Sequence, residues 1–247
     1  MTKTHTKPSG RIALERDGAL CWITFDNPAR MNALNTAMWR ALPEIVSEAE
    51  ADETVRVVLL RGAGDRAFSA GADISEFATA RTGDTAKTYD ELNHAAFNAV
   101  MDCAKPTIAA VNGHCMGGGT ELALCCDLRL ASEGSSFAIP AAKLGIGYNA
   151  RWIRPLLSAL TPTRAKELLF TGRSFSHDEA LAMGLINRVC APDVLESEAR
   201  ALAEEIAANA PMAVLAAKRG IDELTRAPEN PDLAALDALV DACFASD

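Results

Sequence analysis

The chain has 247 residues, of which 49% are hydrophobic and 23% are charged. This composition is that of a globular protein, and the length suits one large domain or little more. The net charge of −9 argues against a general nucleic-acid-binding or anionic-membrane surface. Any anionic ligand therefore has to be met by a few local cations or by main-chain N–H groups.

The cysteines and the N-terminal segment bear on where the protein works. There are seven cysteines, none at CxxC spacing, and several of them lie in apolar runs. This pattern predicts buried free thiols in a reducing compartment. The opening segment MTKTHTKPSG has no apolar stretch, and no run of the sequence approaches the ~20 apolar residues that a spanning helix needs. We therefore expect a cytoplasmic protein.

The first predicted elements are a hairpin and a helix. The segment 11–28 alternates apolar and polar residues on both sides of Asp17-Gly18, a dipeptide that favours a tight turn between two strands. From Thr36 apolar residues recur at helical spacing, and Asn35 is the predicted N-cap. The sequence thus predicts an N-terminal β-hairpin followed by a helix.

A strand–turn–helix unit then occurs at least twice. A strand over 55–62 precedes the Gly/Ala turn of 69–73, and a helix follows over about 84–102. A buried strand over 107–113 leads into a second glycine turn and a short buried helix. Strands that alternate with helices in this way predict an α/β fold with a layered or spiral core.

The rest of the chain is predicted to be mainly helical. Thr161 caps a helix that starts at Pro162, and SHDE at 176–179 is a capping box. We place a soft boundary between a core of residues 1–190 and a helical C-terminal region of residues 191–247. The second region is a candidate for packing on a neighbouring subunit.

Two turns carry the chemistry of the sequence, SAGAD at 69–73 and MGGGTE at 116–121. In each, small residues stand where a strand passes into a helix, whose first N–H groups have no internal partner and attract negative charge. Small side chains let a ligand oxygen reach those N–H groups. Two such turns side by side would form an oxyanion hole.

These segments resemble a known family. AFSAGADISEF and KPTIAAVNGHCMGGGTELALCCDLRLAS are similar to the enoyl-CoA hydratase/isomerase (crotonase) superfamily, and the similarity covers most of residues 11–190. The resemblance implies a spiral of ββα units with a helical C-terminal region, an acyl-CoA thioester substrate, and a homotrimer or dimer of trimers. It implies no cofactor, with coenzyme A present only as part of the substrate.

The resemblance also assigns residues, position by position. Ala70 and Gly118 match the two residues whose N–H groups hold the thioester oxygen, and each such donor can lower the barrier by ~3 kcal/mol. Asp73 and Ile74 follow the first turn, near where the family binds the adenosine part of CoA. Arg30 precedes the MNAL segment that the family places near CoA, so we expect it to meet a phosphate.

Glu121 is the predicted acid/base. It matches one of the two glutamates that family hydratases use to position and activate water, and a carboxylate at this place can take a proton from water or carbon. Its alternative role is to compensate the helix dipole, which is worth ~0.3–1 kcal/mol. The apolar residues after it make burial for that purpose expensive, so we favour the catalytic role.

The second hydratase glutamate falls at Ala141, which cannot transfer a proton. Three functions therefore stay open: an enoyl-CoA hydratase as the leading prediction, a Δ3,Δ2-enoyl-CoA isomerase that uses Glu121 as its single base, and an acyl-CoA binding or assembly subunit with little turnover. Tyr148 could face the acyl group, whereas Asn149 is expected to bond its own backbone.

Other residues that could line an acyl pocket are aromatic or apolar, although core packing is the more common role for any one of them: Phe77, Leu92, Phe97 and Trp152. No HExxH motif, CxxC pair or carboxylate cluster indicates a metal site. Members of the family commonly continue past the final ASD with a helix that helps to close the CoA site. Either a further segment follows Asp247, or closure differs here.

Overall fold

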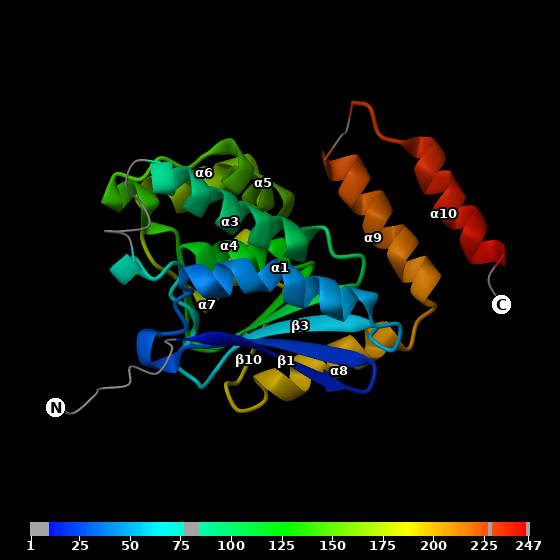
Figure 1. The fold of residues 1–247 in the computed structure, drawn as a ribbon, viewed down its shortest axis with the longest axis horizontal. Coiled ribbons are helices and arrows are strands. Elements are labelled where there is room, and N and C mark those ends of the chain that lie inside the picture. Colours follow the sequence, from blue (N-terminus) through cyan, green and yellow to red (C-terminus); the bar gives the residue numbers. More distant parts are fainter. Residues whose placement is uncertain (1–9, 77–83, 227–228, 246–247) are drawn as a thin grey trace.

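The computed structural model describes residues 10–76, 84–226 and 229–245. Two sheets are covered by helices, as Figure 1 shows. The six-stranded sheet has the order β1 (Arg11–Asp17), β2 (Leu20–Asp26), β3 (Val57–Gly62), β5 (Thr107–Val111), β7 (Leu128–Ser132) and β10 (Arg188–Cys190). The four-stranded sheet has the order β4 (Ala67–Ser69), β6 (His114–Met116), β8 (Ser136–Ala138) and β9 (Phe175–Ser176). The predicted α/β class is confirmed.

The described helices are α1 (Thr36–Ala51), α3 (Asp84–Met101), α4 (Gly118–Cys125), α5 (Ala150–Ala159), α6 (Pro162–Thr171), α7 (His177–Met183), α8 (Leu195–Ala207), α9 (Pro211–Arg226) and α10 (Leu233–Ala245). Three short 3-10 helices join them: η1 (Pro28–Arg30), η2 (Ile74–Glu76) and η3 (Pro140–Leu144). Helix α5 is not among the elements predicted from the sequence.

Local signals in the sequence are confirmed where they predict turns and caps. β1 pairs antiparallel with β2 around Gly18, which has a φ of 60°. The side chain of Asn35 accepts a hydrogen bond from the Met38 N–H and caps α1. The capping box of Ser176 and Glu179 is complete at the start of α7. The two caps each satisfy a helix-end N–H group that otherwise has no partner.

The strands β2, β3 and β5 of the six-stranded sheet are buried on both faces, whereas the edge strand β1 has no fully buried residue. Leu20 and Trp22 of β2 belong to a cluster that includes Ala199 and Ala203 of α8, whereas Cys21 and Ile23 point to the opposite face, where α1, α3 and α4 pack. Side chains alternate between the faces because successive residues of a strand point in opposite directions. Sandwiching by helices is the arrangement expected of a mainly parallel sheet.

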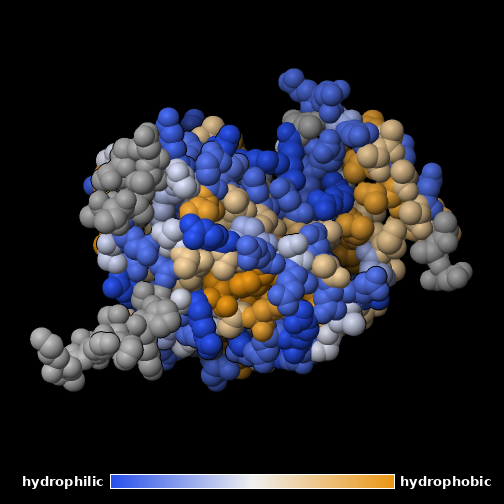
Figure 2. All heavy atoms as spheres, in the orientation of Figure 1, coloured by the Kyte–Doolittle hydropathy of each residue, from blue (hydrophilic) through white to orange (hydrophobic). Residues whose placement is uncertain are grey.

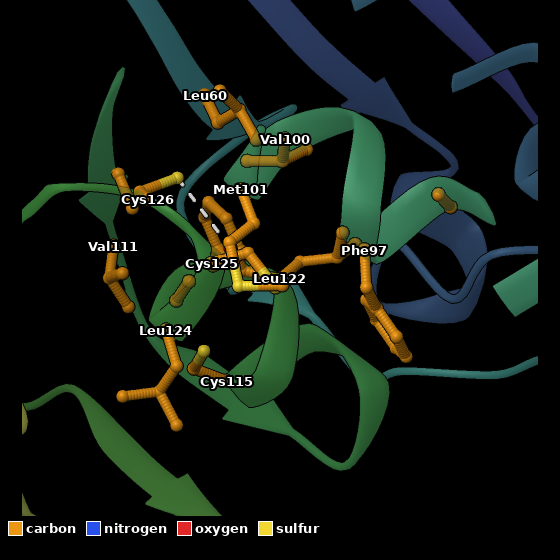
Figure 3. Packing of buried hydrophobic residues seen from close by; sticks show 14 of the residues in the cluster. Leu60, Phe97, Val100, Met101, Val111, Cys115, Leu122, Leu124, Cys125 and Cys126 are labelled. Atoms are coloured by element: carbon orange, nitrogen blue, oxygen red, sulfur yellow. Dashed lines mark hydrogen bonds between the residues drawn. The ribbon is translucent and has the colours of Figure 1, made fainter. Parts of the chain in front are cut away.

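Helix α4 lies in the centre of the larger core cluster. In Figure 3, Val100 and Met101 of α3 lie near Leu122 and Cys125 of α4. All seven cysteines are free thiols and six of them are buried, which confirms the predicted buried thiols. Dense packing of this kind resists displacement of any one side chain, so α4 is held in a fixed position.

The C-terminal part of the chain divides into two structural groups. Helix α8 packs against the six-stranded sheet, whereas α9 and α10 form a helix pair that extends from the body (Figure 1). The helix pair that extends from the body begins at α9, within the region 191–247 that is predicted to be helical. Within the described residues, no helix has the length and apolar character required to cross a bilayer.

Candidate functional site

The sheet topology brings the two glycine turns together. β4 leads into the turn at residues 70–73, and β6 leads into Gly117 and α4. These two strands are neighbours and run parallel in the four-stranded sheet. Because parallel neighbours have their carboxyl ends at the same edge, both turns open at one place, although they are far apart in the sequence.

Steric contacts explain why these turns contain glycine. A Cβ atom on Gly71 would lie 2.6 Å from the Met116 carbonyl oxygen and 2.9 Å from the Gly118 nitrogen, and Gly71 has a φ of +84°. On Gly119 it would lie 2.5 Å from the Ser69 carbonyl oxygen. Gly117 has a φ of 52° and a ψ of −122°, a conformation that side chains disfavour. The glycines therefore permit close approach of two main-chain segments.

The main-chain N–H groups at this junction differ in whether they already have an acceptor. Ala70 donates to the Met31 carbonyl at 2.8 Å, so its N–H group is occupied. Within the described part of the chain, the N–H groups of Ala72 and Gly118 have no acceptor. A Cβ atom on Gly118 would lie 3.9 Å from the Ala72 nitrogen, which shows that the two segments are adjacent. The geometry thus favours Ala72 over the predicted Ala70 as the donor that accompanies Gly118.

Glu121 lies on the first turn of α4 and is 1% exposed. Its Oε2 atom accepts a hydrogen bond from the Tyr148 hydroxyl, and its Oε1 atom is buried without a hydrogen-bond partner in the described structure. Burial raises the pKa of Glu121 well above its usual value of 4.5, although the Tyr148 hydrogen bond acts in the opposite direction. A buried carboxyl group with a raised pKa and one unpartnered oxygen is a candidate for proton transfer to and from a bound molecule.

A cavity of about 160 Å³ connects these groups. Its lining includes Ala70, Ala72, Gly118, Glu121 and Ala141. Apolar and aromatic side chains form most of the remaining wall: Trp39, Phe97, Met116, Ile139, Leu144, Ile146, Tyr148 and Trp152. A mainly apolar cavity with a few converging polar groups is the usual form of a small-molecule site.

The predicted pocket residues differ in their positions. Phe97 and Trp152 line the cavity, and Leu92 packs at the edge of the core instead. Phe77 lies outside the described residues. The Asn149 side chain accepts a hydrogen bond from the Trp152 N–H at 3.2 Å, which confirms that it bonds its own backbone as the N-cap of α5.

The residues predicted to contact CoA lie close to one another. An Arg30 nitrogen lies 2.9 and 3.0 Å from the two carboxylate oxygens of Asp73, and Asp73 is 5% exposed. Burial of the Asp73 carboxyl group opposes its ionisation, but hydrogen bonds from Ser75 and the charge of Arg30 outweigh it, so the pKa of Asp73 is lowered. The Ile74 side chain is 72% exposed beside them. This pair forms a polar border next to the first turn.

Comparison with known proteins identifies the family. Residues 15–247 match the family model described as enoyl-CoA hydratase/isomerase. The chain belongs to this family. It is 35% identical over 236 residues to a short-chain-enoyl-CoA hydratase of Clostridium acetobutylicum, covering 96% of this chain and 90% of that protein. It is also 37% identical over 210 residues to a carnitinyl-CoA dehydratase of Salmonella agona, covering 85% and 79% of the two chains.

Solved structures of the family have the same fold. An enoyl-CoA hydratase/carnithine racemase from Magnetospirillum magneticum superposes with a TM-score of 0.88 at 40% identity, covering 94% of this chain and 86% of the other. An enoyl-CoA hydratase from Bacillus anthracis superposes with a TM-score of 0.85 at 32% identity, covering 94% and 89%. The crotonase-type fold that the family resemblance implied is thereby confirmed.

Some site residues of this family member could not be assigned from the sequence. Asn93 of α3 is 5% exposed and lines the cavity, and it is not among the site residues predicted from the sequence. A signal was present, because Tyr89, Asn93 and Phe97 are four residues apart and share one face of α3. A carboxamide side chain on a helix face that is otherwise aromatic indicates a site that binds a polar group.

Proposed function

We propose that this protein is an enoyl-CoA hydratase that adds water across the C2=C3 bond of a short 2-enoyl-CoA. The observation that carries the proposal is the Glu121 carboxyl group, buried with one oxygen unpartnered in the described structure, in a cavity that the unpaired N–H groups of Ala72 and Gly118 also line. The similarity to enzymes named as hydratases and dehydratases of CoA thioesters supports it.

The two main-chain donors would hold the thioester carbonyl oxygen. Attack at C3 moves the C2=C3 electron pair towards that oxygen and forms an enolate. The two N–H groups bind the negatively charged enolate oxygen more strongly than they bind the neutral carbonyl oxygen. We assign the donors to Ala72 and Gly118. Ala70 would have to break its hydrogen bond to Met31 before it could contribute.

Glu121 would carry the proton between water and carbon. In its ionised form it takes a proton from water as the water oxygen bonds to C3, and it then gives the same proton to C2 of the enolate. One water molecule supplies all the atoms that are added, because its oxygen and one hydrogen become the C3 hydroxyl and its other hydrogen is transferred to C2. Tyr148 orients the carboxylate through Oε2 and leaves Oε1 to exchange the proton.

The cavity favours a short acyl group. Its volume of about 160 Å³ is below the ~300–1,000 Å³ typical of pockets that bind drug-sized molecules. The rings of Trp39 and Phe97 pack edge to face at 5.5 Å in its wall, so a longer acyl group could extend in their direction only if these rings moved. We therefore propose acyl groups of about the size of crotonyl as preferred substrates.

A second candidate is a Δ3,Δ2-enoyl-CoA isomerase. The methyl group of Ala141 in the cavity wall favours it, because an isomerase needs one base to move a proton from C2 to C4. Glu121 could do this without an added water molecule. The third candidate, an acyl-CoA binding subunit, requires binding with little turnover.

One assay distinguishes the three candidates. Purified protein is incubated with crotonyl-CoA and with 3-hexenoyl-CoA, while the conjugated enoyl absorbance and the product masses are followed. Hydration of the first supports the hydratase, and conversion of only the second supports the isomerase. Binding of both without turnover of either, or of a wider acyl-CoA panel, would favour the binding subunit.

We further propose that α9 and α10 bind other copies of this chain. Five large apolar side chains on these helices are exposed: Ile221, Leu224, Leu233, Val240 and Phe244. Figure 2 shows hydrophobic residues on this helix pair at the right of the molecule. A patch of this kind on an otherwise acidic protein favours self-association, in keeping with the trimer or dimer of trimers that we expect. Sedimentation of the Phe244→Glu variant tests this, and an unchanged assembly would contradict it.

A further inference from the structure

We propose that Asn93 binds the water molecule that the enzyme adds, as a second hydrogen-bond acceptor beside Glu121. The inference rests on the proposed hydratase function and extends it. Asn93 takes over water binding in a site where position 141 is alanine, whose side chain has no polar atom.

The Asn93 carboxamide lies in the cavity wall without a protein partner for its oxygen. Asn93 is 5% exposed, lines the cavity, and its Oδ1 atom has no hydrogen-bond partner in the described structure. A buried amide oxygen left unpaired costs ~1–3 kcal/mol. The next turn of α3 carries Phe97, which packs against Trp39, so the helix face that holds Asn93 is fixed.

Few polar side chains line this cavity. Of its described lining residues, only Asn93, Glu121 and Tyr148 carry a carboxamide, carboxylate or hydroxyl group. The Tyr148 hydroxyl donates to Glu121 Oε2. Glu121 Oε1 and Asn93 Oδ1 are then the two buried acceptors of the cavity without a partner in the described structure.

Two acceptors of different basicity match the needs of an attacking water. One of its hydrogens must leave during addition, and Glu121 is a base that can take it. The other hydrogen stays on the C3 hydroxyl, so its acceptor must bind it without removing it. A neutral amide oxygen has this property, and hydrogen bonds to both acceptors leave a water lone pair to attack C3.

The test compares the hydration of crotonyl-CoA by Asn93→Leu and Asn93→Asp with that by the unsubstituted protein. Leucine keeps the volume and removes the acceptor, so we expect kcat to fall about 100-fold while KM stays within about threefold. Aspartate restores an acceptor oxygen and should recover part of the lost kcat. Asn98→Leu, on the same helix but outside the cavity lining, is the matched control and should leave kcat unchanged.

A second readout separates water binding from support of the fold or of Glu121. Exchange of the C2 hydrogen of butyryl-CoA with D2O needs the base and the oxyanion hole but no attack by water. Asn93→Leu should leave that exchange within about threefold of the unsubstituted rate.

Four results would overturn the inference. Unchanged hydration by Asn93→Leu would remove the role, and an equal loss of hydration and C2 exchange would assign Asn93 to structural support. A raised KM with unchanged kcat would make it a substrate-binding residue. Failure of the unsubstituted protein to hydrate any enoyl-CoA would reject the proposed function itself, and the inference with it.

Discussion

The cavity has a main-chain side and a side-chain side, and they are built on different principles. On the main-chain side, the N–H groups of Ala72 and Gly118 are positioned by glycine contacts between two turns. On the other side, Glu121, Asn93 and Tyr148 supply groups that can exchange or orient protons. Most substitutions leave a main-chain N–H donor in place, whereas a single substitution can remove a side-chain group. In the mechanism that we propose, the first side binds the thioester and so sets the class of substrate, and the second side determines the reaction.

The largest effect should come from removing the base on the side-chain side. Glu121→Gln keeps the shape of the side chain but cannot take a proton, so we expect the hydration rate to fall about 100- to 10,000-fold. CoA binding should remain nearly intact, because the oxyanion donors are unchanged. Steady-state kinetics and calorimetric titration with a saturated acyl-CoA measure both. Unchanged turnover would refute the role of Glu121.

The main-chain side can be tested by adding a methyl group. In Gly71→Ala the new Cβ would press on the Met116 carbonyl oxygen and the Gly118 nitrogen, so we expect kcat/KM to fall about 100-fold through displacement of a donor. Gly134 is the matched control, since it has a φ of +81° but no atom within 4 Å of a new Cβ. Gly134→Ala should cost ~1–2 kcal/mol of stability for its backbone conformation and leave kcat/KM unchanged. Equal kinetic effects of the two variants would contradict the steric argument.

A smaller effect is expected when the orientation of the base is changed. Tyr148→Phe removes a hydrogen bond that favours the ionised form of Glu121, so the pKa of Glu121 should rise further. At neutral pH we expect kcat to fall about tenfold, which corresponds to ~1.4 kcal/mol. The acidic limb of the pH–rate profile should move to higher pH. A fall in kcat without that shift would point to a packing role for the ring.

Stability should also report on the buried carboxyl group. Burial raises the pKa of Glu121 in the folded state. The contribution of its protonated carboxyl group to the stability of the fold is therefore fully present below the unfolded-state pKa of about 4.5, and it is lost as the pH rises through the folded-state pKa. A glutamine side chain does not ionise, so the Glu121→Gln variant does not lose this stability as the pH rises. The Tm of Glu121→Gln should therefore increase relative to the unsubstituted protein between pH 5 and pH 9. A constant difference across this range would contradict a raised pKa.

The smallest effect concerns the border of the cavity. Arg30 is paired with Asp73 and its side chain is 46% exposed, so its contribution to phosphate binding is screened by solvent. Arg30→Ala should raise KM for acyl-CoA less than tenfold and leave kcat unchanged. Arg164→Ala, an exposed arginine of α6, serves as the control. An unchanged KM would remove Arg30 from the CoA site.

The sequence was informative where neighbouring residues determine the structure. The Asp17-Gly18 turn, the Asn35 cap and the Ser176 capping box are local devices, and each was predicted. The family resemblance pointed to Gly118 and Glu121 because their spacing within one turn and helix is itself local.

Contacts between distant segments could not be predicted in this way. The N–H group of Ala70 is occupied by the carbonyl of Met31, which belongs to a segment before α1. The pairing of Tyr148 with Glu121 likewise joins a loop and a helix that are 27 residues apart. Which donor is open and which oxygen is unpaired depends on such long-range contacts, so these properties emerge only in the folded chain.

The contact between Gly71 and Gly118 also bears on how this site can be engineered or diversified. Because the two turns fit against each other without room for a methyl group, a change in one requires a compensating change in the other. Recombination that separates residues 69–73 from 116–121 would break this fit, even if each segment were taken from a working enzyme. The two segments therefore have to be exchanged together. The substrate range is better altered through the helices that line the acyl pocket.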